Sequence, residues 1–150
     1  MEWKMNHAIV YPTVDCAIFE DNLFNRILLA RKPGQNLYRF VGGFVDPADD
    51  SYEDSAIREA KEETGLDCVF GGYVTSRKVN DPRYKDKEDK IITTLTALVS
   101  LSPLEDAKAN DDIEEVKVFD VHDVNESMLM PEHKPLWKHL LAWIEWNYDR

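Results

Sequence analysis

The chain has 150 residues, and 18 Lys and Arg against 29 Asp and Glu give it a formal net charge of −11. This length suits a single domain over residues 1–150, and the hydrophobic content of 43% is typical of a folded globule and excludes a wholly disordered chain. A strongly acidic chain offers no basic face, which argues against nucleic acid or an anionic membrane as its main partner.

Strands and turns are predicted in the first third of the chain. Stretches rich in β-branched and apolar residues predict three strands, at residues 8–19, 26–30 and 37–41. Lys32-Pro33-Gly34 predicts a turn after the second strand, and Gly42-Gly43 directly follows the third. All three predicted strands precede the first predicted helix in the sequence.

A helix is predicted over residues 51–64. Asp50 or Ser51 can cap its N-terminus, and Gly65 is well placed to end it. Three further strands and a second helix are predicted at residues 68–78, 91–101, 116–120 and 131–146. The charged residues 81–90 separate two of these strands as a long loop. This mixture predicts an α+β domain built as an α/β/α sandwich.

The two cysteines indicate the compartment. Cys16 and Cys68 form neither a CxxC pair nor a metal-binding spacing, and two reduced, buried cysteines are typical of a cytosolic protein. No apolar stretch reaches the roughly 18 residues that a membrane span needs, and none near the start has the form of a secretory signal. We therefore expect a cytoplasmic protein that does not act at a membrane.

The acidic charge is concentrated in two blocks. Residues 46–67 and residues 105–126 each contain nine acids and two bases, whereas residues 1–45 and 68–104 are net positive. Solvated surface faces are the ordinary explanation of such blocks. The first block also contains the predicted central helix, which makes a second explanation possible.

Three carboxylates of the central helix share one side. Glu59, Glu62 and Glu63 fall within an arc of about 100° at helical spacing. Repulsion at these spacings destabilises a bare helix by a few tenths of a kcal/mol per pair, and Arg58 alone does not neutralise three anions. A hard divalent cation such as Mg²⁺ or Mn²⁺ would do so and would recruit phosphates. Spacing alone allows a solvated acidic stripe equally well.

The residues around this helix resemble a known family. Gly43, followed by Arg58-Glu59-x-x-Glu62-Glu63-x-Gly65-Leu66, is similar to the Nudix box, written G-x5-E-x7-R-E-U-x-E-E-x-G-U with U apolar. The second half matches at every fixed position. The resemblance implies the Nudix fold, with a mixed sheet, a box helix and a C-terminal helix.

The loop of the box departs from the pattern. Counting back from Arg58 places Asp50 at the first acidic position, whereas counting forward from Gly43 places Asp49 there, so the loop is one residue longer than the pattern. Because loops absorb insertions, we predict that the register holds on the helix side. Asp50 is then the acid that supports Arg58 and the loop.

The resemblance implies a role for each matching residue. Glu59 and Glu63 match the main metal ligands, and the carbonyl of Gly42 matches a backbone ligand. Glu62 matches a third carboxylate that binds the metal or the catalytic water, and Arg58 matches the arginine that orients a glutamate. The implied cofactor is Mg²⁺ (or Mn²⁺), and the implied chemistry is attack on a pyrophosphate by a water that metal ions activate.

The second acidic block offers a catalytic base. Residues 110–116 precede a predicted strand, as the late acidic loop does in Nudix domains that act on ADP-ribose and related dinucleotides. We predict Asp112 as the base, with Asp111 and Glu115 as alternatives. This reading requires Asp111 or Asp112 to approach Glu63 across one cleft.

The substrate is predicted from the same resemblance, which is strongest to the ADP-ribose pyrophosphatase and nucleotide-sugar pyrophosphatase branch. The predicted reaction converts ADP-ribose to AMP and ribose 5-phosphate, and a homodimer is plausible for such an enzyme. Two alternatives stay open: a hydrolase of nucleoside triphosphates or dinucleoside polyphosphates, and a non-catalytic Nudix-like sensor that binds a nucleotide. His133 is a further candidate to line the pocket, and the predicted substrate-binding residues are Arg31, Arg39, Arg83 and Tyr38.

Overall fold

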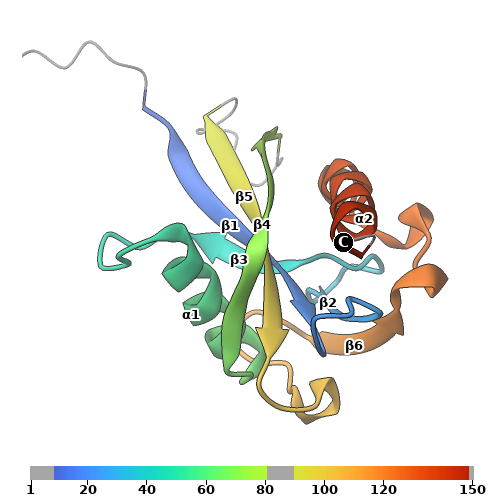
Figure 1. Cartoon of the computed structure of the whole chain (residues 1–150). Helices are drawn as coiled ribbons and strands as arrows, with labels where there is room; N and C mark the ends of the chain where they lie inside the picture. Colours follow the sequence, from blue (N-terminus) through green and yellow to red (C-terminus); the bar gives the residue numbers. More distant parts are fainter. Residues whose placement is uncertain (1–8, 81–89, 149–150) are drawn as a thin grey trace, which may run out of the picture.

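The computed structural model describes residues 9–80 and 90–148. Its strands are β1 (Tyr11–Phe19), β2 (Arg26–Arg31), β3 (Val41–Phe44), β4 (Cys68–Val79), β5 (Ile91–Ser100) and β6 (Glu115–Asp120). Its helices are α1 (Tyr52–Thr64) and α2 (Lys134–Tyr148), with short 3-10 turns η2 (Leu104–Asp106), η3 (Val121–Asp123), η4 (Glu126–Met128) and η5 (Pro131–His133). Figure 1 shows these elements along the chain.

The strands form one mixed sheet that forks beside β1. The order is β4-β5-β1-β2-β6, and β3 pairs with β1 outside this path. β1 runs parallel to β5 along its whole length, so β2 and β3 share its other edge. β2 pairs with the end of β1 through Ile18 and Phe19, and β3 pairs with residues 13–16. The Gly42-Gly43 segment of β3 therefore lies at the fork.

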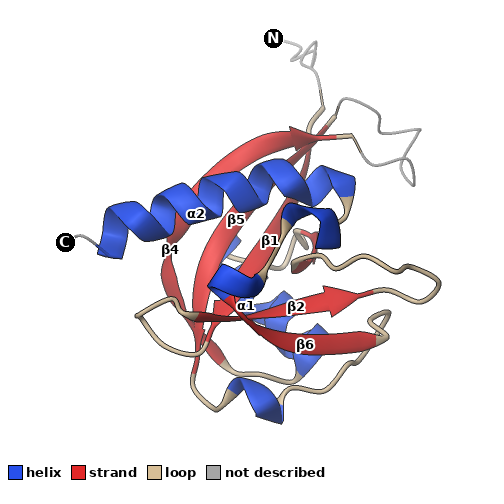
Figure 2. Ribbon diagram, turned by 90° about the vertical axis from the view of Figure 1, so that its right-hand side faces the viewer, coloured by secondary structure: helices blue, strands red, loops and turns tan. Residues whose placement is uncertain are grey.

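The sheet is buried on both faces. Alternate residues of a strand point to opposite faces: Val14 and Cys16 of β1 pack in the cluster that contains residues of α1, whereas Ala17 and Phe19 pack in the cluster that contains residues of α2. Figures 1 and 2 show the two helices on opposite sides of the sheet. The predicted α+β sandwich is confirmed.

Helix α1 has the ends that its sequence predicts. The Ser51 side chain accepts a hydrogen bond from the Asp54 backbone N–H at 3.0 Å, which makes Ser51 the N-cap. Gly65 takes the left-handed conformation at φ 77° and donates its N–H to the Lys61 carbonyl at 2.9 Å, a conformation that glycine adopts at little cost. These two residues fix the register of the box carboxylates on the helix.

The third strand was predicted too early in the chain. β3 begins at Val41, and Tyr38 and Arg39 before it form only isolated bridges. Their backbone groups bond to two different partners, because Arg39 exchanges hydrogen bonds with Ala30 of β2 while Tyr38 bonds to Met128 and Met130. Because the backbone hydrogen bonds of this segment go to two different partners, it forms no continuous strand pairing, although both partners hold it in place.

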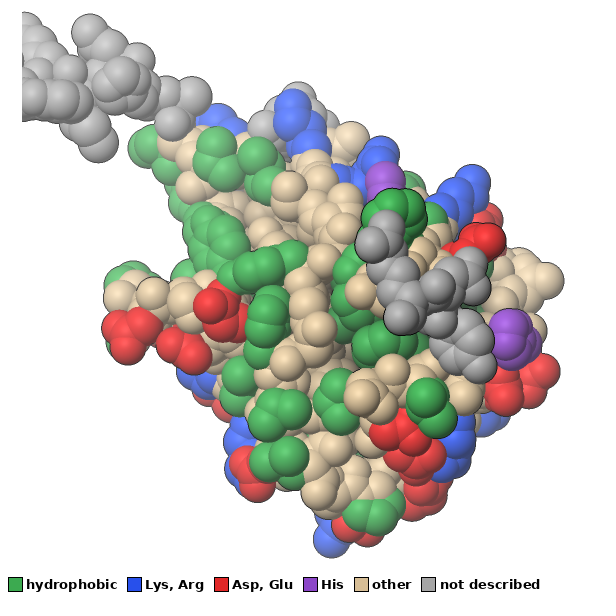
Figure 3. All heavy atoms as spheres, viewed as in Figure 1, with side chains coloured by type: hydrophobic (Ala, Val, Ile, Leu, Met, Phe, Trp, Pro, Cys, Tyr) green, Lys and Arg blue, Asp and Glu red, His purple; other side chains and the backbone are tan. Residues whose placement is uncertain are grey.

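Strand β4 lies at an edge of the sheet and carries exposed apolar side chains. Val69, Phe70 and Tyr73 are 44%, 42% and 49% exposed, and the two rings contact each other edge to face at 4.9 Å between centroids. Figure 3 shows apolar side chains on this face of the molecule.

Cys16 and Cys68 are both buried and free, as predicted. Within the described residues no helix is both long and apolar enough to cross a membrane.

Candidate active site

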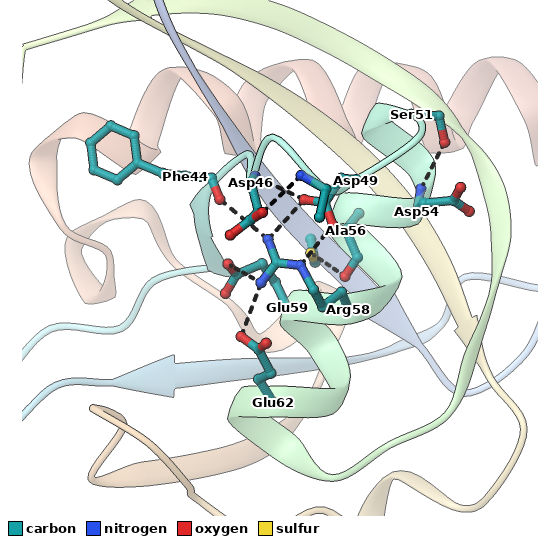
Figure 4. Close-up of polar contacts among 11 residues, drawn as sticks. Phe44, Asp46, Asp49, Ser51, Asp54, Ala56, Arg58, Glu59 and Glu62 are labelled. Carbon is teal, nitrogen blue, oxygen red and sulfur yellow. Dashed lines mark hydrogen bonds and ion pairs between the residues drawn. The ribbon is translucent and has the colours of Figure 1, made fainter.

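An ion pair anchors the loop before α1. Arg58 donates from Nε and Nη2 to the two carboxylate oxygens of Asp49, both at 2.9 Å, and Asp49 also accepts the Asp46 backbone N–H at 2.9 Å (Figure 4). The prediction that Asp50 supports Arg58 was wrong. Asp50 is exposed and precedes the N-cap Ser51, so the extra residue lies between the supporting acid and the helix. The Arg58 guanidinium holds the pKa of Asp49 well below its usual range.

Arg58 also contacts two of the box glutamates. Its Nη1 donates to Glu59 at 3.2 Å and to Glu62 at 3.1 Å, and its Nη2 donates to the Phe44 carbonyl at 3.3 Å (Figure 4). Burial raises the pKa of Glu59, and the charge of Arg58 opposes that shift. The Glu62 side chain is 48% exposed, whereas that of Glu59 is 10% exposed.

Glu63 is the least compensated carboxylate of the group. It is 4% exposed, and its Oε2 atom has no hydrogen-bond partner among the described residues. Burial, followed by the charges of Glu59 and Asp112, raises the pKa of Glu63 to about 8. The Lys32 charge and a hydrogen bond from the Gly42 backbone oppose this shift without cancelling it. A buried carboxylate of this kind is costly unless something positive joins it.

The two glycines of β3 allow close approaches on different sides, Gly42 to β1 and Gly43 to the side chain of Glu59 on α1. A Cβ atom on Gly43 would lie 2.6 Å from the Glu59 carboxylate, and one on Gly42 would lie 2.1 Å from the Val14 carbonyl oxygen. Both distances are far below van der Waals contact, but a side chain at Gly42 would collide with the fixed backbone of β1, whereas one at Gly43 would push the Glu59 carboxylate aside. The backbone at the fork therefore lies directly against the box carboxylates.

The second acidic block reaches the same site. Asn110 donates its backbone N–H to the carbonyl of Glu63 at 3.0 Å, and the carboxylate of Asp112 acts on the pKa of Glu63 while that of Asp111 acts on the pKa of Glu59. The block therefore lies next to Glu63, although neither Asp111 nor Asp112 is among the described residues that line the pocket. Asp112 itself pairs with Lys32 at 3.1 Å and is 60% exposed, so water has access to it.

The predicted substrate contacts divide into separate groups. Arg31 donates a hydrogen bond to Glu115 at 3.1 Å, and the Tyr38 hydroxyl donates one to Glu115 at 2.6 Å. A pocket lies at the fork of the sheet beside Gly42 and Gly43, and neither Arg31 nor Tyr38 is among the described residues that line it. Arg39 does line that pocket, together with Gly42, Gly43 and Glu63. Arg83 lies outside the described residues.

Three pocket residues come from turns that carry no motif. Lys32 follows β2, and Glu132 and His133 belong to η5; all three line the pocket. The His133 ring is 5% exposed, and its Nδ1 accepts the Phe40 backbone N–H at 3.2 Å. The sequence offered His133 as a candidate from its place near the last helix, but no local pattern pointed to Lys32 or Glu132.

The residues present fit a hard divalent cation. The described part of the chain contains no preformed group of three or more His, Cys, Asp or Glu side chains that could hold a metal. Mg²⁺ does not require one, because it usually binds one or two carboxylates, keeps several waters and shares substrate phosphates. Glu59 and Glu63 would supply oxygen ligands, and a cation beside Glu63 would give its Oε2, which has no partner among the described residues, a partner.

Comparison with known proteins identifies the family. A family model described as NUDIX domain matches residues 11–141. The chain belongs to the Nudix family. The match contains every element of the site, from β1 to the first half of α2, so the resemblance carried by the box extends to the whole domain.

Three relatives illustrate the similarity of this Nudix domain. An ADP-ribose pyrophosphatase from Methanocaldococcus jannaschii is 29% identical over 146 residues, covering 93% of this chain and 79% of that protein. A CTP pyrophosphohydrolase from Escherichia coli is 40% identical over 57 residues, a match that spans 35% of this chain and 42% of that relative. The NUDIX domain of Shewanella oneidensis NrtR, solved with ADP ribose, has a TM-score of 0.69 at 20% identity and covers 92% of this chain and 90% of that one. It shares the fold.

Proposed function

We propose that this Nudix pyrophosphohydrolase uses Mg²⁺ (or Mn²⁺) to hydrolyse ADP-ribose to AMP and ribose 5-phosphate. The observation that carries the proposal is the buried Glu63 carboxylate, whose Oε2 has no partner among the described residues and which lies beside Glu59 in the pocket at the fork. Such a site favours a divalent cation, and the cation favours phosphates. The similarity to an ADP-ribose pyrophosphatase over 93% of the chain supports the choice of substrate.

Each box residue has a part in this proposal. Glu59 and Glu63 would hold the metal together with the Gly42 carbonyl, and Glu62 would join them or bind the attacking water. Bound there, the metal supplies charge neutralisation at the phosphate oxygens and an acidified water. Arg58 keeps the two helical glutamates oriented through its contacts at 3.2 and 3.1 Å.

Asp112 is the proposed base. It accepts the proton of the attacking water, whose oxygen forms a bond to one phosphorus while the bond from that phosphorus to the bridging oxygen breaks. The leaving phosphate keeps the bridging oxygen and its electron pair. Asp112 is exposed to water and pairs with Lys32 at 3.1 Å, and Lys32 lines the pocket that contains Glu63.

A second substrate class has its own support. The 40% identity over 57 residues is to a CTP pyrophosphohydrolase, which favours hydrolysis of nucleoside triphosphates at the same metal site. The two possibilities differ in their products, because a triphosphate yields a nucleoside monophosphate and pyrophosphate. A panel of ADP-ribose, nucleotide sugars and nucleoside triphosphates separates them in one experiment.

The deciding measurement is Mg²⁺-dependent AMP release from ADP-ribose by the wild type, Glu63→Gln and Glu145→Gln. Glu145 is exposed on α2, far along the chain from the box, so its variant is the matched control. We expect turnover by the wild type and the control, and a loss of at least a hundredfold in Glu63→Gln, about 2.7 kcal/mol or more. Equal activity of Glu63→Gln would overturn the site assignment. Calorimetric binding of ADP-ribose without turnover of any substrate would favour a sensor.

We also propose a cytoplasmic homodimer. Two buried, free cysteines suit a reducing compartment, and the exposed apolar side chains on edge strand β4 are available for contact with a second copy. Light scattering coupled to gel filtration measures the mass in solution, and a monomer at all concentrations would refute the dimer.

A further inference from the structure

One ion pair in the pocket has no part in the metal chemistry. Arg39 Nη2 lies 3.4 Å from Glu132 Oε1, and the two side chains are only 6% and 12% exposed. Both line the same pocket as Gly43 and Glu63. Removing two charges from water costs more than a long contact returns, so a buried pair of this kind is weak as a source of stability. Its position in the wall of a ligand pocket suggests that the ligand uses it.

The pair is held by rigid neighbours. Arg39 bonds through its backbone to Ala30 of β2, with N–O distances of 2.8 and 2.9 Å. Glu132 lies in η5, which His133 ties to the strand side by accepting the Phe40 backbone N–H at 3.2 Å. The rings of His133 and Phe40 also pack together, with centroids 5.6 Å apart. Donor and acceptor are therefore preorganised before a ligand arrives.

The rest of the wall indicates the shape of the ligand. The pocket is also lined by the apolar side chains of Phe44 of β3, Val79 at the end of β4 and Ile91 at the start of β5, and by the polar side chains of Thr13, Asp15 and Lys32. Apolar side chains beside one buried donor and acceptor suit a flat group with apolar faces and a polar edge. A nucleobase has this form, whereas a sugar ring is puckered and carries several hydroxyls around its edge.

We propose that the Arg39–Glu132 pair selects the base of the substrate by reading the amino edge of adenine. Adenine places an N–H donor at N6 next to an acceptor at N1. Glu132 accepts from the N6 amino group, and Arg39 donates to N1. This inference rests on the proposed function and adds the base-specifying residues to it.

The same pair rejects a base with the opposite edge. Hypoxanthine carries an acceptor oxygen at position 6 and a donor N–H at N1, so it would face Glu132 with an oxygen and Arg39 with a hydrogen. A correctly matched bidentate contact is worth about 1–3 kcal/mol of discrimination, or roughly 5- to 150-fold. The expected preference for ADP-ribose over inosine diphosphate ribose is within this range.

The test compares kcat/KM for these two substrates in the wild type, the R39E/E132R double variant and the control Glu145→Gln. The double variant keeps both charges in the pocket and exchanges donor and acceptor, so it avoids leaving a buried charge unpaired. We expect the wild type and the control to prefer adenine, and the double variant to prefer hypoxanthine. An unchanged preference in R39E/E132R, or equal use of both substrates by the wild type, would overturn the inference.

A binding measurement separates this inference from the proposed function. Calorimetry of AMP and IMP with the same three proteins reports base selection without turnover. If ADP-ribose is not hydrolysed but AMP binds more tightly than IMP and R39E/E132R reverses the order, the function fails and the base selection stands. If both diphosphates are hydrolysed equally and AMP and IMP bind equally, the function stands and the base selection fails.

Discussion

The Asp49–Arg58 pair makes a prediction that can be worked out from the structure. Asp49 is 8% exposed at its side chain and accepts two hydrogen bonds from Arg58 at 2.9 Å. Asp49→Asn keeps the shape but removes the charge and one acceptor. Hydrogen bonds to charged groups contribute about 1.5–3 kcal/mol each; because Arg58 is 30% exposed, solvent screening reduces the loss. We expect the free energy of unfolding to fall by about 2 kcal/mol, using the midpoint of that range for one lost bond.

Urea unfolding of the metal-free protein at pH 7 measures this loss. The midpoint should fall with an unchanged denaturant slope, and the Tm should fall by roughly 4–8 °C, at about 2–4 °C per kcal/mol for a chain of this size. The matched control is Asp50→Asn, one residue later and exposed, which should stay within about 0.5 kcal/mol of the wild type. An equal loss in the two variants would refute the assignment of the supporting acid to Asp49.

The pH dependence of the same loss tests its electrostatic origin. Arg58 lowers the pKa of Asp49 below that of an unfolded chain, so the stability that the pair contributes is fully present above the unfolded value, near pH 4, and is lost as pH falls through the folded value. The difference between the wild type and Asp49→Asn should therefore shrink progressively below about pH 4. A difference that grows on acidification would contradict this account.

Three further variants probe the site and its support. Gly43→Ala places a Cβ atom 2.6 Å from the Glu59 carboxylate; calorimetry should show at least a tenfold loss of Mg²⁺ affinity, about 1.4 kcal/mol, with an unchanged circular dichroism spectrum. Glu63→Gln replaces a buried carboxyl group whose Oε2 has no partner among the described residues and whose pKa burial raises to about 8. The unfolded chain ionises this group freely at pH 7 and the folded chain does not, so the metal-free variant should unfold at a higher temperature while the Tm increase on adding Mg²⁺ disappears. Gly72→Ala puts a Cβ atom 2.7 Å from the Trp143 ring and should cost about 1–3 kcal/mol in urea unfolding; no loss would contradict the β4–α2 packing.

The local elements could be predicted because their signals are local. Ser51 and Gly65 end α1 through contacts that reach no further than four residues, and the β-branched and apolar residues of the first strand are enough to predict β1. The strand at 37–41 was misplaced because its backbone partners, Ala30 and Met128, come from distant parts of the chain. A pattern read along one segment holds no information about such partners.

The site could be predicted only in part for the same reason. The box glutamates follow from helical spacing and from the resemblance, but the supporting acid depends on how far the Arg58 side chain reaches across a loop. Counting residues left both Asp49 and Asp50 available, and the buried geometry selects Asp49. Lys32 and Glu132 have ordinary neighbours in the sequence, and only the fork in the sheet brings them to the pocket.

Once the ion pairs are known, the net charge of −11 can be traced to individual acids and their partners. Several acids of the two blocks are neutralised in the fold: Asp49 by Arg58, Glu59 in part by the same guanidinium, and Asp112 by Lys32. Glu63 has the charge of Lys32 nearby, yet its pKa stays raised to about 8 because burial and its acidic neighbours outweigh that cation. The metal site that we propose therefore centres on one buried carboxylate where the two acidic blocks meet, and not on the acidic surface. Removing exposed acids elsewhere should change the net charge without changing Mg²⁺ affinity by more than the weak effect of screened charges.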